Sequence, residues 1–129
     1  MAGPVRPTTS TPTSGASPIR WRRPGASRSS ANQYPNSFVG TDLHDRLQKL
    51  GATNLVLAGF MTHMCVNSTA RGAFNLGYAV TVVGGATATR ALPAAGGKVM
   101  PAQTVHDASL AMIGDVFGVV VETTAAIST

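Results

Sequence analysis

The chain has few or none of the sequence features that would indicate a function directly. One cysteine in 129 residues excludes an internal disulfide and a metal site built from cysteines alone. Three histidines without ligand spacing (His44, His63 and His106) do not indicate a metal site either. No apolar run approaches the roughly 20 residues that span a bilayer, and the N-terminus lacks the apolar segment of a secretory signal. We therefore predict a cytoplasmic protein with no cofactor, no metal ion and no membrane partner.

Acidic residues are also few, and they are unevenly distributed. Five Asp and Glu oppose ten Lys and Arg, which gives a net charge of +5. All of the excess lies before residue 36, where five arginines have no acidic counterpart. From residue 36 onward the two signs balance, and no basic surface with interleaved aromatic residues is indicated. We predict that nucleic acid is not a partner.

Residues 1–31 differ in composition from the rest of the chain. They hold five of the eight prolines together with many Ser, Thr and Arg, and they show no apolar periodicity. Such a segment cannot bury enough surface to offset the entropy lost on ordering, so we predict a disordered tail. An organellar transit peptide has a similar composition, but the prolines disfavour the amphipathic helix that it needs. One globular domain is predicted over residues 32–129.

From residue 42 onward, periodicity predicts alternating helices and strands. Leu43, Leu47 and Leu50 recur at helical spacing and are followed by Gly51, which predicts a short amphipathic helix over 42–50. The later predicted elements are a strand over 54–58 buried on both faces, a helix from 64 or 65 to 76, a strand over 78–83, a loop or short helix over 84–89, a helix over 101–115 and a strand over 116–122. This order implies a parallel sheet with helices on its faces.

The stretch Gly59–Arg71 joins the first predicted strand to a helix and carries the single cysteine, Cys65. Free backbone N–H groups and the dipole at a helix start stabilise negative charge, so a thiol placed there is pushed toward thiolate. Ligands of open α/β sheets bind at the carboxyl ends of the strands, which Gly59–Cys65 and Gly84–Thr89 both follow. We predict the functional site at this edge.

Several segments together resemble the isochorismatase-like cysteine hydrolases. They are Asn36–Leu43, Leu50–Gly51, Gly59–Arg71, Gly77–Tyr78, Ala86–Thr89 and Val105–Leu110. Their order and spacing are similar to that family over about residues 34–122. The resemblance implies a three-layer α/β/α doubly wound parallel sheet, of which only the C-terminal three strands with their helices are recognisable here.

The resemblance also implies a set of site residues. Cys65 is expected to be the nucleophile that attacks a small amide-type or related molecule and forms an acyl-enzyme. A non-proline cis peptide is expected between Phe60 and Met61, and the N–H groups of Met61 and Cys65 are expected to form an oxyanion hole. Phe38 and Thr62 are the expected substrate-binding residues, although Phe38 fits core packing equally well.

The departures from the family pattern concern the partners of the thiol. The family has an aspartate base on an N-terminal strand and a lysine shortly before the position of Asn36. This chain has no Asp or Glu before Asp42, and Asn32 occupies the lysine position. His63 is a candidate substitute base, although side chains in tight turns more often point elsewhere. We expect a truncated domain with impaired activity, the alternative being a non-catalytic remnant or interaction module.

The family resemblance also predicts a surface through which copies of the chain associate. The strand over 54–58 is central in the family, and here it would present an unpaired apolar edge. Long apolar edges invite pairing with another chain. We therefore predict a homo-oligomer formed through this sheet edge, acting on a small-molecule substrate.

Overall fold

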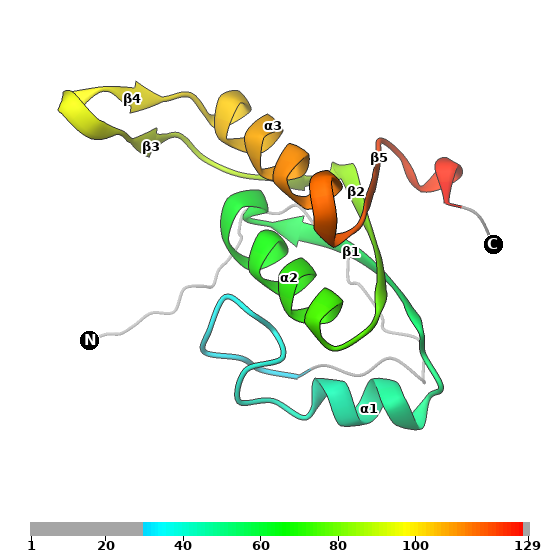
Figure 1. Cartoon of the computed structure of the whole chain (residues 1–129). Coiled ribbons are helices and arrows are strands. Elements are labelled where there is room, and N and C mark those ends of the chain that lie inside the picture. Colours follow the sequence, from blue (N-terminus) through cyan, green and yellow to red (C-terminus); the bar gives the residue numbers. More distant parts are fainter. Residues whose placement is uncertain (1–29, 128–129) are drawn as a thin grey trace, which may run out of the picture.

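Three parallel strands in the order β1-β2-β5 form the main sheet of the protein (Figure 1). They are β1 (Asn54–Phe60), β2 (Ala79–Ala88) and β5 (Val119–Val121). The structure is a computed structural model and describes residues 30–127. Apart from its last two residues, the tail predicted over 1–31 lies outside this range. The α/β fold with a parallel sheet is confirmed.

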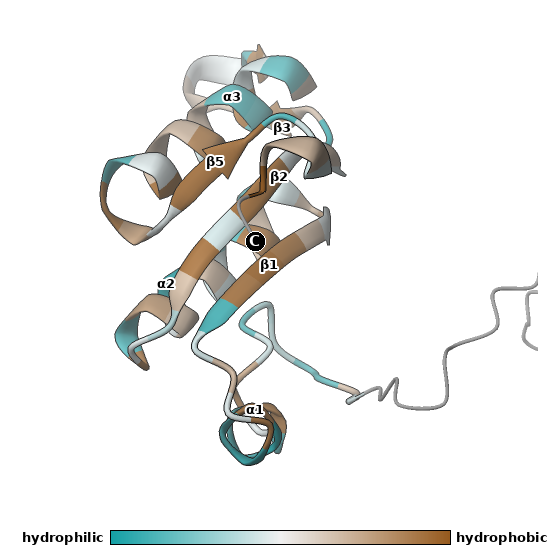
Figure 2. Ribbon diagram, turned by 90° about the vertical axis from the view of Figure 1, so that its right-hand side faces the viewer, coloured by the Kyte–Doolittle hydropathy of each residue, from teal (hydrophilic) through white to brown (hydrophobic). Residues whose placement is uncertain are grey.

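Two helices cover one face of the sheet, as Figure 2 shows. Helix α2 (Asn67–Asn75) connects β1 to β2, and α3 (Ala102–Met112) lies between β2 and β5. A short hairpin of β3 (Leu92–Pro93) and β4 (Val99–Met100), which the sequence did not predict, projects before α3 (Figure 1). The core between sheet and helices consists of Val66, Ala70, Ala73, Tyr78, Val80, Val82 and Ile113.

Helix α1 (Leu43–Lys49) agrees with the helix predicted over 42–50. Its Leu47 packs against the core, while Leu50 just beyond its end is exposed. Asp42 precedes the helix, and a 2.7 Å hydrogen bond from the Arg46 guanidinium holds the pKa of its carboxyl below the usual value. This helix leads directly into the edge strand β1.

The prediction that the first strand is buried on both faces is wrong. Burial along β1 alternates, with Leu55 and Leu57 turned toward the core while Val56 is 52% exposed and Phe60 is 76% exposed. In residues 30–127, helices α2 and α3 lie only on the Leu55 and Leu57 side (Figure 2). The apolar run therefore forms a strand with one covered face.

The helix that follows β1 and the strand β5 begin at other residues than predicted, because a wide helical turn lies beside each of them. The helix predicted from residue 64 or 65 begins earlier, with a π-helical turn over Thr62–Val66 that continues into α2. Helix α3 likewise ends in a wide turn over Ile113–Phe117, so β5 begins at Val119 and not at Val116.

Strand β2 continues through Ala88, so the loop or short helix predicted over 84–89 is wrong. Gly85 explains why this segment can stay extended. Its N–H donates to the carbonyl of Glu122 at 2.9 Å, and a Cβ at this position would lie 2.5 Å from the same oxygen. The glycine allows the backbone to approach the chain beyond β5, which extends the strand toward the candidate site.

Candidate functional site

A pocket of about 280 Å³ opens beside Cys65 along the carboxyl-terminal half of β1. We call it the thiol pocket. Its lining residues are Ser37, Val56, Leu57, Ala58, Gly59, Phe60, Cys65, Val66 and Thr69. None of them is acidic or basic. Cys65 therefore borders a pocket of apolar and hydroxyl-bearing side chains.

The turn Thr62–Val66, here called the cysteine turn, positions the thiol. The carbonyl of Met61 accepts hydrogen bonds from the N–H groups of Met64 at 3.0 Å and Val66 at 3.2 Å. The peptide bond between Phe60 and Met61 is cis, at the bond where the family resemblance placed one. Val66 is buried in the core, whereas the free thiol of Cys65 is only partly buried. The cysteine thus stands where the helix begins, between the core and the pocket.

Two histidine–threonine hydrogen bonds flank this turn. Thr62 is fully buried, and its Oγ1 lies 2.9 Å from Nδ1 of His106 on α3. His63 pairs through Nδ1 with Oγ1 of Thr89, just beyond the end of β2. Neither histidine lines the thiol pocket. The structure therefore gives the candidate base His63 a partner other than the thiol, and it directs the Thr62 hydroxyl toward α3.

Ser37 also borders the thiol pocket, a place that was not predicted for it from the sequence. Its N–H donates to Oγ1 of Thr69 at 3.1 Å, and the Thr69 hydroxyl lies 3.1 Å from Ser37 Oγ. Gly72, one turn further along α2, leaves room for the side chain of Asn36. A Cβ there would lie 2.6 Å from Asn36 Nδ2. The only signal for Ser37 was its place in the Asn36–Leu43 segment.

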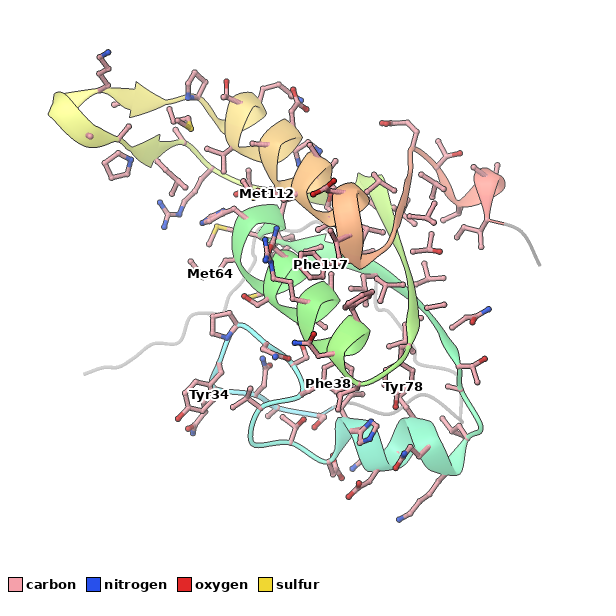
Figure 3. The ribbon with its side chains drawn as sticks, viewed as in Figure 1. Tyr34, Phe38, Met64, Tyr78, Met112 and Phe117 are labelled. Carbon is pink, nitrogen blue, oxygen red and sulfur yellow. The ribbon has the colours of Figure 1, made fainter. Side chains whose placement is uncertain are left out.

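Phe38 lies away from the thiol pocket, in an aromatic group near α1 (Figure 3). Its ring stacks on Tyr78 with centroids 5.9 Å apart. The Tyr78 hydroxyl lies 2.8 Å from Nδ1 of His44, and the rings of His44 and Phe38 meet edge to face at 6.5 Å. These contacts favour the packing alternative for Phe38.

Among residues 30–127, no three or more His, Cys, Asp or Glu side chains cluster in a way that could hold a metal ion. Within the same range, every helix is too short or too polar to cross a membrane. The side chains that line the thiol pocket supply one thiol, from Cys65, and two hydroxyl groups, from Ser37 and Thr69.

Sequence comparison identifies relatives over most of the described chain. The profile of the isochorismatase domain matches residues 28–125. The uncharacterised isochorismatase family protein YddQ of Bacillus subtilis is 43% identical over 91 residues, which cover 70% of this chain and 50% of YddQ. The secreted isochorismatase effector Isc1 of Verticillium dahliae is 42% identical over 88 residues, covering 68% of this chain and 44% of Isc1. The chain spans about half the length of these relatives.

Solved structures show the same similarity. An isochorismatase from Pseudomonas putida matches with a TM-score of 0.77 and 37% identity, over 82% of this chain and 54% of that one. A cysteine hydrolase from Pseudomonas syringae matches with a TM-score of 0.66 and 27% identity, over 69% and 42% of the two chains. A pyrazinamidase/nicotinamidase from Streptococcus mutans matches with a TM-score of 0.59 and 31% identity, over 70% and 44%.

Proposed function

Because this chain belongs to the isochorismatase family of hydrolases, we propose that it is a cysteine hydrolase acting on a small amide-type or related molecule. The observation that carries this proposal is the position of Cys65, its thiol beside a pocket of about 280 Å³ at the start of a helix. The names of two structural neighbours, a cysteine hydrolase and a pyrazinamidase/nicotinamidase, support a thiol nucleophile and an amide substrate.

In the proposed reaction the Cys65 thiolate attacks the carbonyl carbon of the bound amide. A carbon–sulfur bond forms, the carbon–nitrogen bond breaks, and the nitrogen leaves after gaining a proton. Water then attacks the thioester, which releases a carboxylic acid and restores the thiol. The N–H groups of Met61 and Cys65 are proposed to stabilise the negative oxygen of the tetrahedral intermediates, an effect typically of about 10²–10³ in rate for each donor.

The lining of the thiol pocket leads us to propose that turnover by this chain is slow. No pocket-lining residue is acidic or basic, so no side chain there is suited to take up the thiol proton or to protonate the leaving nitrogen. The same observation supports a second candidate function, in which the protein is a non-catalytic interaction module that retains the fold.

We also propose a cytoplasmic location.

We further propose that copies of the chain associate through the edge of β1. In the described residues β1 pairs only with β2. The exposed side chains of Val56 and Phe60 make β1 an apolar edge strand, and such strands favour pairing with a further strand. The thiol pocket, lined by the Val56–Phe60 half of β1, would then lie beside the partner copy.

Hydrolysis and alkylation of the same preparation test the proposed function. The chain has one cysteine, so iodoacetamide reports on Cys65 alone. We expect slow release of ammonia from at least one member of a panel containing nicotinamide, pyrazinamide and simple aliphatic amides. One equivalent of iodoacetamide should abolish this release, and Cys65→Ala and Cys65→Ser should reduce it by about a thousandfold or more, to background.

The matched control is Ser37→Ala, which alters the same pocket without removing the nucleophile. It should retain at least about a tenth of the parent rate. Unchanged hydrolysis in Cys65→Ala would contradict the thiolate mechanism. Absence of turnover across the panel, together with alkylation at the rate of a free thiol at every pH, would instead support the interaction module.

A further inference from the structure

We propose that His106 is a positioning residue for the cysteine turn. Its hydrogen bond to Thr62 fixes the orientation of Thr62–Val66, and with it the direction of the Cys65 thiol and of the neighbouring N–H donors. This inference rests on the proposed function of Cys65, because a positioning residue acts through the group that it orients.

Burial explains why the hydrogen bond holds the turn firmly. Thr62 has 0% exposure, so its hydroxyl has no access to water and depends on a protein partner. That partner is Nδ1 of His106, 2.9 Å from Oγ1. A buried hydroxyl that loses its partner is strongly disfavoured. Any movement of the turn that separates Thr62 from His106 is therefore opposed.

Helix α3 holds the cysteine turn at both of its ends. His106 contacts Thr62, the first residue of the turn. One turn further along α3, the carbonyl of Ser109 accepts a hydrogen bond of 3.4 Å from Nδ2 of Asn67, the residue directly after the turn. The Ser109 hydroxyl in turn donates to the carbonyl of Val105 within α3. The five residues that include Cys65 thus lie between two contacts with one rigid helix.

A second contact supports the turn from the sheet. His63, next to Thr62, pairs with Thr89 immediately after β2. Both threonines and both histidines come from segments that meet at the carboxyl ends of the strands. The turn is therefore connected to α3 by His106 and to β2 by His63, so its orientation depends on both.

His106 lies where it can position the cysteine turn without contacting a substrate in the thiol pocket. His106 does not line the thiol pocket; it borders a different hollow together with Thr87, Thr89 and Gln103. Loss of its hydrogen bond should therefore change the catalytic step and leave substrate affinity nearly unaltered. Small misplacements of reacting groups lower rates strongly, and a single hydrogen bond corresponds to about a fivefold effect.

Four variants test the inference. Thr62→Val and His106→Phe remove one partner each and preserve shape, whereas Thr62→Ser keeps the hydroxyl and His106→Asn keeps a polar atom close to the position of Nδ1. The control is His44→Phe. His44 makes the same kind of bond, Nδ1 to the Tyr78 hydroxyl at 2.8 Å, but does so at α1.

We expect Thr62→Val and His106→Phe to lower kcat by about five- to tenfold with KM within about twofold of the parent. The double variant should be no slower than either single one, because both remove the same bond. Thr62→Ser and His106→Asn should recover most of the rate, and His44→Phe should match the parent. Equal losses in His106→Phe and His44→Phe, or additive losses in the double variant, would overturn the inference.

Alkylation of Cys65 by iodoacetamide separates this inference from the proposed function, since it requires no substrate. It should slow by about fivefold in His106→Phe and remain unchanged in His44→Phe. If the parent hydrolyses no amide but shows this difference, the proposed function fails and the positioning role stands. If the parent hydrolyses an amide and the two variants are alkylated equally fast, the positioning role fails and the function stands.

Discussion

Strands β1 and β2 are neighbours with similar apolar sequences, yet their environments differ. They pair in parallel with Leu55 opposite Val80 and Leu57 opposite Val82. On the face of the sheet that α2 and α3 leave open, Val83 on β2 is 2% exposed, whereas Val56 on β1 is 52% exposed. In the described residues β2 has a strand on each side and β1 has one. Position in the sheet, and not composition, therefore determines how much each strand contributes to the core.

The largest effect that should separate the two strands is a buried charge. Val82→Asp would place a carboxylate in the core, at a cost of about 4 kcal/mol or more, and the protein should lose its cooperative unfolding transition. Val56→Asp should change the free energy of unfolding by only about 0.5–1 kcal/mol. Urea unfolding followed by circular dichroism measures both. Similar losses in the two variants would show that the Val56 face is covered in solution.

A smaller effect should come from the close approach of β2 to the segment before β5. Gly118 has extended backbone, but a Cβ there would lie 2.6 Å from the carbonyl oxygen of Val80. Gly118→Ala should therefore destabilise the protein by about 1–3 kcal/mol. Gly114→Ala is the matched control, because its Cβ would lie 3.7 Å from Val120, an ordinary contact. If both substitutions have the same effect, backbone proximity at β2 is not the cause.

The smallest change in stability should accompany a change in association. Val56→Lys adds a charge to the open edge of β1, and charged edge residues oppose pairing between strands. We expect the free energy of unfolding to stay within about 0.5 kcal/mol of the parent, while the fraction of dimer or larger oligomer falls. Sedimentation velocity over a range of concentrations measures this fraction. An unchanged oligomer distribution would argue that β1 is not the contact.

Much of the fold could be predicted from residue patterns. Leu43, Leu47 and Leu50 predicted α1, and the apolar run Asn54–Ala58 predicted β1 because its length suits a strand. The family resemblance is confirmed as well, because the separate short segments that carried it occur together in the right order. For the site, the same pattern singled out Cys65, which the structure places beside a pocket.

The remaining features depend on contacts between distant residues. The extension of β2 through Gly84 and Gly85 has no signal in strand propensity, and it exists because glycine admits the Glu122 carbonyl. The pairing of Thr62 with His106 spans 44 residues, and nothing in either segment alone indicates it. The exposure of one face of β1 depends on which helices cover the sheet. An apolar run in the sequence does not indicate this.

The cysteine turn is π-helical, and this affects the angle between Cys65 and the apolar residues of α2 that face the core. The hydrogen bond from the Val66 N–H to the Met61 carbonyl spans five residues, where an α-helical one would span four. Each residue advances an α-helix by about 100°, so the extra residue in this turn changes the angle between the start of the helix and Ala70 and Ala73 by up to about that amount. The wide turn therefore rotates the start of the helix relative to the apolar stripe of α2. It lets one continuous helix keep its apolar stripe on the sheet while the residue at its start faces the pocket.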